Sequence, residues 1–168
     1  MRSYSILILL FLPAACMAQA TNGYGFFMAG QQRAYGSTAA TYGFGGGVDH
    51  QFGGAVGGGM DIEGIVPGRG RASQTVGAFS GNIFIHPIKD RKKDIFVTGG
   101  YGLIFRDFAA NGFNFGAGWN YWAGEHTALR IEGRLFRAYR AAPGPAAETW
   151  STWWGIRVGL TFGTPYFH

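Results

Sequence analysis

The chain has few charged residues, one cysteine and no long apolar stretch. Charged side chains make up 14% of its 168 residues, against ~25% in an average soluble domain. Beyond the N-terminal segment, no apolar run approaches the ~20 residues that a transmembrane helix needs. The low charge argues against an ordinary water-soluble surface, and the short apolar runs argue against a helical membrane protein.

The first 18 residues have the three-part pattern of a secretory signal peptide. Arg2 supplies the positive charge, an apolar run covers residues 6–12, and small residues follow it. We therefore predict a signal peptide over 1–18, cleaved near Ala18 or Ala20, and export of the mature chain from the cytoplasm.

The only cysteine, Cys16, lies inside this leader. Cleavage would remove it, and disulfide, zinc and thiol chemistry would be lost with it. Residues 12–16 resemble the lipobox of bacterial lipoproteins, in which the cysteine is lipidated. Because Pro13 stands where a lipobox usually carries leucine, simple cleavage is favoured and lipidation of Cys16 remains the alternative.

Glycine and aromatic residues are abundant together. The chain contains 30 glycines, 15 phenylalanines, 8 tyrosines and 5 tryptophans. Disordered or fibrous glycine-rich segments lack such aromatic residues, so the mixture favours strands that face lipid or a crowded interior.

The chain has a net charge of +5 but no long basic run, and its lysines all lie within residues 89–93. This distribution argues against nucleic-acid binding.

Apolar residues recur at every second position, which is the period of a β-strand. In the last segment one face carries Trp150, Thr152, Trp154, Ile156, Val158, Leu160 and Phe162, and the other carries Ser151, Trp153, Gly155, Arg157, Gly159 and Thr161. The preceding segment points Leu129, Ile131 and Leu135 outward and Arg130, Glu132, Arg134 and Phe136 inward. Strands in lipid must satisfy their backbone hydrogen bonds among themselves and close into a ring.

Six further segments complete the set. Outward positions are Phe113, Phe115, Ala117, Trp119 and Tyr121; Ile95, Val97, Tyr101, Leu103 and Phe105; Phe79, Ile83 and Ile85; and Val56, Met60 and Ile62. The glycine-rich start leaves the strand phases open, with Tyr24, Phe26 and Met28 on one face of the first strand and Tyr42, Phe44 and Val48 on one face of the next. We predict an all-β fold, an eight-stranded antiparallel up-and-down transmembrane β-barrel over 21–162, with a short tail at 163–168.

Alternate connections should be short and face the periplasm. The predicted periplasmic turns are 52–54, 88–94 and 123–126, and the predicted external loops are 32–40, 66–74, 106–112 and 139–148. Aromatic residues near strand ends predict interface girdles: Tyr35, Tyr42, Tyr139, Trp150 and Trp153 outside, and Trp119, Tyr121, Trp122 and Phe162 on the periplasmic side.

Inward-facing charges are the most specific chemical feature. The predicted lumen charge network consists of Asp61, Glu63, Arg106, Arg130, Glu132, Arg134 and Arg157. An eight-stranded barrel has an interior just wide enough for side chains, and buried charges must pair. We expect the network to pack the lumen; the alternative is a gate, in which exchange of ion-pair partners opens a narrow ion pore.

No catalytic, cofactor or metal site is predicted. The histidines His50, His86, His126 and His168 are dispersed, which does not favour a metal site, and no serine stands near a histidine and an acid at strand spacing. The glycine runs 43–47 and 57–59 lack the following helix and lysine of a phosphate loop. A lipid-modifying barrel enzyme with a Ser/His pair is kept as an alternative.

The mature chain resembles the small outer-membrane β-barrel family typified by the OmpA membrane domain and OmpX. Its last strand looks like the family's C-terminal assembly signal, carried here by Gly155, Ile156, Val158, Leu160 and Phe162. The resemblance implies the barrel-assembly machinery as a partner during insertion. The phenylalanine is commonly the last residue in that family, whereas residues 163–168 follow it here.

The expected role is structural or adhesive, in the bacterial outer membrane, as a monomer without cofactor. Four loop arginines are candidates for contact with anionic lipopolysaccharide: Arg33, Arg69, Arg71 and Arg140. The alternatives from other classes are a narrow ion pore and a soluble, secreted, glycine-rich β-protein.

Overall fold

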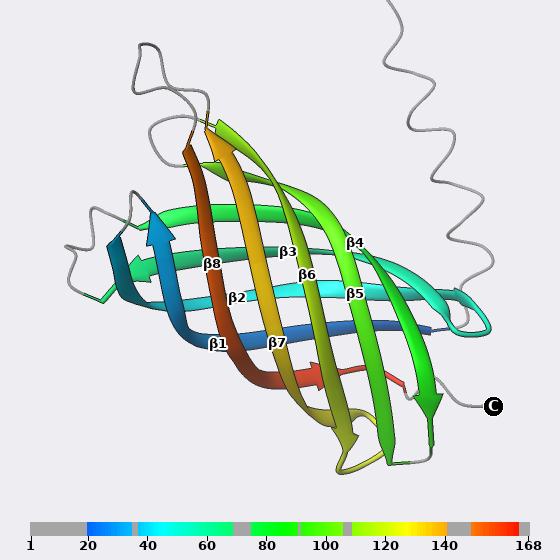
Figure 1. The fold of residues 1–168 in the computed structure, drawn as a ribbon. Helices are drawn as coiled ribbons and strands as arrows, with labels where there is room; N and C mark the ends of the chain where they lie inside the picture. Colours follow the sequence, from blue (N-terminus) through cyan, green and yellow to red (C-terminus); the bar gives the residue numbers. More distant parts are fainter. Residues whose placement is uncertain are drawn as a thin grey trace, which may run out of the picture.

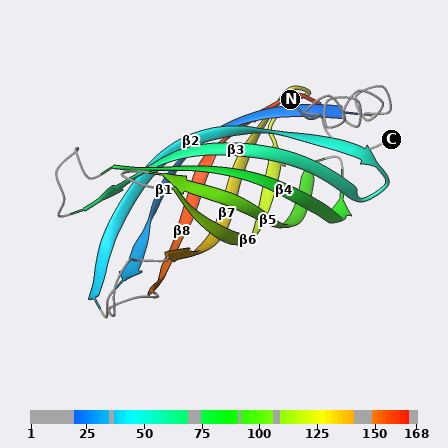
Figure 2. The ribbon, with the colours of Figure 1, turned by 90° about the horizontal axis from the view of Figure 1, so that it is seen from above.

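The computed structural model describes residues 20–34, 37–68, 75–90, 92–105, 109–140 and 149–164. Each strand pairs with its neighbours in an antiparallel register, and β8 pairs with β1 to close the barrel (Figures 1 and 2). The fold prediction is confirmed, whereas the signal peptide over 1–18 and the end of the tail lie outside the described residues. The strands are β1 (Ala20–Ala34), β2 (Ser37–Gly53), β3 (Val56–Pro67), β4 (Val76–Lys89), β5 (Lys93–Phe105), β6 (Ala109–Trp122), β7 (Thr127–Arg140) and β8 (Thr149–Phe162).

Burial alternates along the strands as the sequence pattern predicts. In β4, Ser80 and Asn82 are buried, while Phe79 and Ile83 on the other face are exposed. Each strand contributes at least one exposed apolar side chain to a belt around the barrel, such as Phe27, Phe44, Ile62, Ile83, Val97, Phe115, Ile131 and Ile156. A water-soluble monomer rarely exposes a continuous apolar surface of this extent, so the belt is suited to lipid. No helix in the described part of the chain is long and apolar enough to cross a membrane.

The structure resolves the phase of the first strand. Tyr24, Phe26 and Met28 all face the lumen. Their direct partners on β2 are Gly47, Gly45 and Gly43. Each large inward side chain of β1 therefore stands beside a residue without a side chain, which leaves room for two aromatic rings in a narrow barrel.

The strands extend further than predicted at several connections. β4 runs to Lys89 and β5 begins at Lys93, so 88–94 is mostly strand and only 90–92 connects the two. Similarly, β1 and β2 occupy most of 32–40, β6 begins inside 106–112, and β7 enters 139–148. The predicted boundaries were wrong because ladder hydrogen bonds continue past the end of the apolar alternation.

The barrel has two distinct ends. We call the end with the short connections after β2, β4 and β6 the turn end, and the opposite end the loop end; the start of β1 and the end of β8 lie at the turn end (Figure 1). The turn after β2 places Gly54 at a φ of +56°, a left-handed conformation that suits glycine. Trp122 and Trp153 are buried in the lumen, which corrects their assignment to the interface girdles, since both continue the inward phase of their strands.

Candidate functional site

The lumen holds a cluster of buried charges at mid-height, which we call the lumen charge cluster. Three arginines, Arg130, Arg134 and Arg157, face four carboxylates, and all seven side chains are nearly inaccessible to solvent. The carboxylates are Asp49 from β2, Asp61 and Glu63 from β3, and Glu132 from β7. Inward alternation on β7 places Arg130, Glu132 and Arg134 in a row, so one strand supplies both signs of charge.

Glu132 contacts all three arginines. Its Oε2 accepts hydrogen bonds from Nε and Nη2 of Arg130 at 3.1 and 3.0 Å. Its Oε1 accepts one from Nε of Arg134 at 2.5 Å and one from Nη1 of Arg157 at 3.5 Å. Arg130 also donates to Oδ2 of Asp49 at 3.1 Å, so the cluster extends from β7 across the lumen to β2.

Asp61 is the second point of convergence. Its Oδ2 accepts hydrogen bonds from Asn82 at 2.8 Å, from the Tyr24 hydroxyl at 3.3 Å and from Arg134 at 3.4 Å. Arg157 lies 3.7 Å from the same oxygen and donates to Oε2 of Glu63 at 2.6 Å. Buried charges of opposite sign thus offset the cost of removing them from water.

Aromatic rings cover the arginines on their flat faces. The Arg130 guanidinium carbon lies 4.2 Å from the centre of the Tyr24 ring and 4.1 Å from that of Phe96. The Arg157 guanidinium lies 4.2 Å from the Phe26 ring. Such contacts stabilise a desolvated cation. Asn114 of β6 accepts a hydrogen bond from Nη1 of Arg134, so with Phe96 on β5 every strand of the barrel contributes to the cluster or its surroundings.

An apolar layer closes the lumen toward the loop end. We call it the loop-end layer; its buried members are Met28, Ile65, Ala78, Ile104, Phe136, Ala138 and Trp153. Phe136 also lies beside Arg134 and Arg157, at 5.9 and 5.4 Å from their guanidinium carbons. The layer therefore lies between the lumen charge cluster and the loop end of the barrel.

A second polar group fills the turn end of the lumen. His86 Nδ1 lies 2.7 Å from Oδ1 of Asp94, and Asn120 donates to Oδ2 of the same carboxylate at 2.9 Å. Thr161 in turn donates to Asn120 at 3.4 Å. All four side chains are buried, so polar side chains line the lumen at the turn end and apolar ones line it toward the loop end.

Six of the seven residues predicted for the charge network lie together in the lumen charge cluster. The seventh, Arg106, lies outside the described residues. Sequence reasoning missed Asp49 and Asp94. Asp49 directly follows the outward Val48 and so has the inward phase, a signal that the neighbouring glycines obscured, and Asp94 had been placed in a turn.

The other predicted positions lie elsewhere on the barrel or outside the described residues. Arg33 is exposed near the loop end; Arg69 and Arg71, like the side chain of Arg140, lie outside the described residues. On β8, Ile156, Val158, Leu160 and Phe162 face outward and Gly155 faces the lumen. His50 Nδ1 lies 2.7 Å from the Thr21 hydroxyl and His126 is exposed; His168 is outside the described part. Among the described residues, no group of three or more histidine, cysteine or acidic side chains is arranged to hold a metal.

Comparison with known proteins identifies the architecture. No protein-family model matches the sequence, and no curated protein matches it. Solved structures do match: Neisserial surface protein A aligns with a TM-score of 0.68 at 8% identity, over 85% of this chain and 97% of that one. The chain has the fold of the small outer-membrane β-barrels. The N-terminal barrel of Pseudomonas aeruginosa OprF aligns with this small barrel at a TM-score of 0.55 and 15% identity, over 87% and 98% of the two chains.

The small outer-membrane barrel fold does not by itself decide whether the chain is an enzyme. The outer-membrane protease OmpT of Escherichia coli also aligns with it, at a TM-score of 0.50 and 9% identity, over 86% of this chain and 97% of that one. One architecture carries different activities. The absence of catalysis therefore stays a prediction.

Proposed function

We propose that the chain is a monomeric outer-membrane barrel with a sealed lumen, which serves a structural or surface-contact role in the bacterial envelope. Two observations support its place in a membrane: the exposed apolar belt and the fold shared with outer-membrane proteins. The observation that carries the sealed lumen is the combination of the lumen charge cluster with the loop-end layer.

A sealed lumen predicts that the protein conducts no ions across a bilayer. Ions crossing the barrel would have to displace paired arginines at the lumen charge cluster and then pass the apolar loop-end layer, where an ion loses its hydration. Purified protein, shown to be folded by migration on a gel that shifts only after boiling, should give no conductance steps in planar bilayers even at high load. Regular steps from the folded fraction would instead support the narrow ion pore.

We also propose lipopolysaccharide as a contact at the loop end. The support is charge: Arg33 is exposed there, and the sequence places Arg69, Arg71 and Arg140 in or beside the neighbouring loops. Guanidinium groups pair well with phosphates. Assembly by the barrel-assembly machinery through the outward residues of β8 is the second proposed partnership.

Replacing the four arginines with glutamine should weaken lipopolysaccharide binding at least tenfold, because each loses a charge-assisted hydrogen bond to phosphate. Binding of the folded variant and the wild type can be compared by surface plasmon resonance in detergent. The control replaces Lys89, a cation at the opposite end of the barrel, with glutamine. Equal affinities of wild type and quadruple variant would refute the contact.

A further inference from the structure

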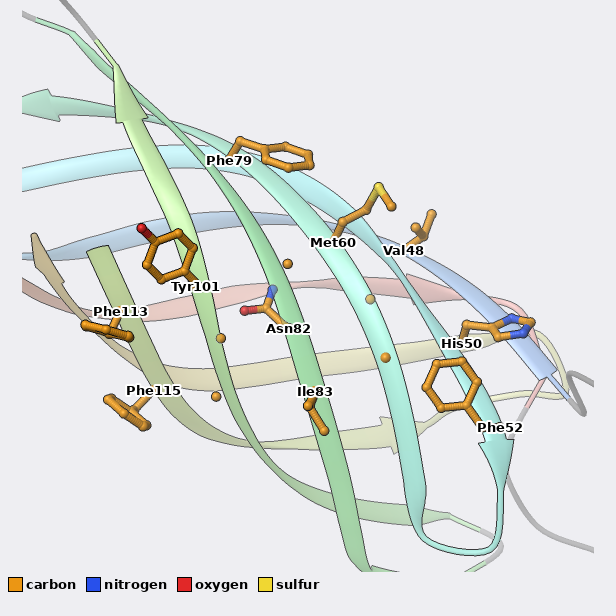
Figure 3. Close-up of a pocket in the computed structure, with 15 residues that line it drawn as sticks. Val48, His50, Phe52, Met60, Phe79, Asn82, Ile83, Tyr101, Phe113 and Phe115 are labelled. Carbon is orange, nitrogen blue, oxygen red and sulfur yellow. The ribbon is translucent and has the colours of Figure 1, made fainter. Parts of the chain in front are cut away.

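The lipid-facing surface of the barrel is hollowed on one side, over β2 to β6 (Figure 3). We call this hollow the outer-wall groove. It has a volume of about 940 Å³, and Gly58, Gly81 and Gly99 lie at its floor. Met60, Tyr101 and Phe115 are among the side chains around it (Figure 3). The side chains in its lining face outward, except that of Asn82, which faces the lumen.

Strand register creates the groove. Across the sheet, Gly58 pairs with Ile83, and Ile83 pairs with Gly99. One row further along, Met60 pairs with Gly81, and Gly81 with Tyr101. Positions without a side chain therefore alternate with large apolar residues in both directions, and the missing side chains leave a depression in an otherwise raised apolar belt.

The packing of the protein does not require two of these glycines. A Cβ added at Gly81 would meet nothing within 4 Å, and one at Gly99 would only touch the Phe115 ring at 3.5 Å. The glycine at position 45, in contrast, leaves room for Phe26 inside the lumen. The absence of a side chain at Gly81 and Gly99 therefore serves no packing inside the protein, and it leaves the groove open.

The groove continues toward the turn end. A second hollow of about 440 Å³ shares Ile83, Gly99 and Phe115 with it and extends to Ile85 and Val97. The same two strands end at the β4–β5 connection, where Lys92 and Lys93 are exposed. An apolar track thus leads to a pair of positive charges.

We propose that the outer-wall groove binds one acyl chain of an anionic phospholipid, whose phosphate lies at Lys92 and Lys93. The inference rests on the proposed membrane location. Within a bilayer, lipid tails are as apolar as the protein surface, so selective binding comes from close packing in a shaped depression. Basic residues beside the membrane attract anionic headgroups, which distinguishes this occupant from a zwitterionic lipid and from a second barrel.

Native mass spectrometry of the folded protein in detergent tests the proposal, with dioleoyl phosphatidylglycerol as the probe. We expect one lipid to bind at least tenfold more tightly than any later one. Gly81→Leu and, independently, Gly99→Leu should weaken the first binding event at least tenfold by filling the groove. Gly133→Leu is the matched control, because Gly133 also faces outward and its added Cβ would approach only the Ala117 carbonyl oxygen, at 3.9 Å.

A separate variant tests the proposed contact between the lipid phosphate and the two lysines. Replacing Lys92 and Lys93 with glutamine should weaken phosphatidylglycerol binding about fivefold and leave phosphatidylcholine binding unchanged. Equal loss in Gly81→Leu and Gly133→Leu, no loss in either groove variant, or tighter binding of lipid A than of phosphatidylglycerol would each overturn the proposal. Migration that shifts on boiling tests barrel folding separately, so failure of the groove and failure of the proposed function are distinguishable.

Discussion

Replacing Glu132 with glutamine should lower the free energy of unfolding by about 3–5 kcal/mol, the cost of breaking a buried ion pair from one side. Glu132 is the carboxylate that contacts Arg130, Arg134 and Arg157. Its neutralisation leaves three buried guanidinium groups with reduced compensation. Equilibrium urea unfolding in lipid vesicles, followed by tryptophan fluorescence, measures the difference.

The control for this substitution is Glu125→Gln. Glu125 is exposed in the connection between β6 and β7, where removal of a charge should change stability by no more than about 0.5 kcal/mol. Similar unfolding curves for the two variants would show that Glu132 contributes little to the free energy of unfolding of the barrel.

Gly45→Ala should be nearly as damaging, with a loss of about 1–3 kcal/mol from overpacking. The added methyl group would lie 2.4 Å from the Ile62 carbonyl oxygen and 2.8 Å from both the Glu63 Cβ and the Phe26 ring. Because the first of these is backbone, the strand itself must shift. The same vesicle assay reports the change as a lower urea midpoint.

Gly133→Ala is the comparison for Gly45→Ala. It makes the same chemical change on an outward position whose added methyl group meets no atom closer than 3.9 Å. It should be neutral or slightly stabilising, since alanine restricts the unfolded chain more than glycine does. If both alanine variants unfolded at the same urea concentration, glycine at position 45 would not be needed for lumen packing.

The sequence predicted the barrel because both faces of the later strands are chemically distinct. Arg130, Glu132 and Arg134 alternate with Leu129, Ile131 and Leu135, so only one phase is physically reasonable in lipid. In β1 and β2 the glycines removed that contrast. The lumen position of Tyr24 and Phe26 is shown by their burial in the structure, and their glycine partners across the strand provide the room.

The partners within the lumen charge cluster were beyond sequence reasoning. Alternation assigns a side chain to the inside, but the stagger of the strands decides which inward residues stand at the same height. The contact between Arg130 and Asp49 joins β7 to β2 across the barrel, and no local pattern encodes it. The outer-wall groove depends in the same way on the registers of β2 to β6.

The seam between β1 and β8 has a consequence for biogenesis. Gly23 pairs with Phe162 and Arg33 with Thr152, so the ring is joined by the first and the last of its eight strands. Until β8 has been made, the sheet has two open edges. Their unpaired backbone N–H and C=O groups find no hydrogen-bond partner in the hydrocarbon of a membrane. Stable insertion must therefore wait until β8 has been made, and the nascent barrel needs protection from aggregation until then.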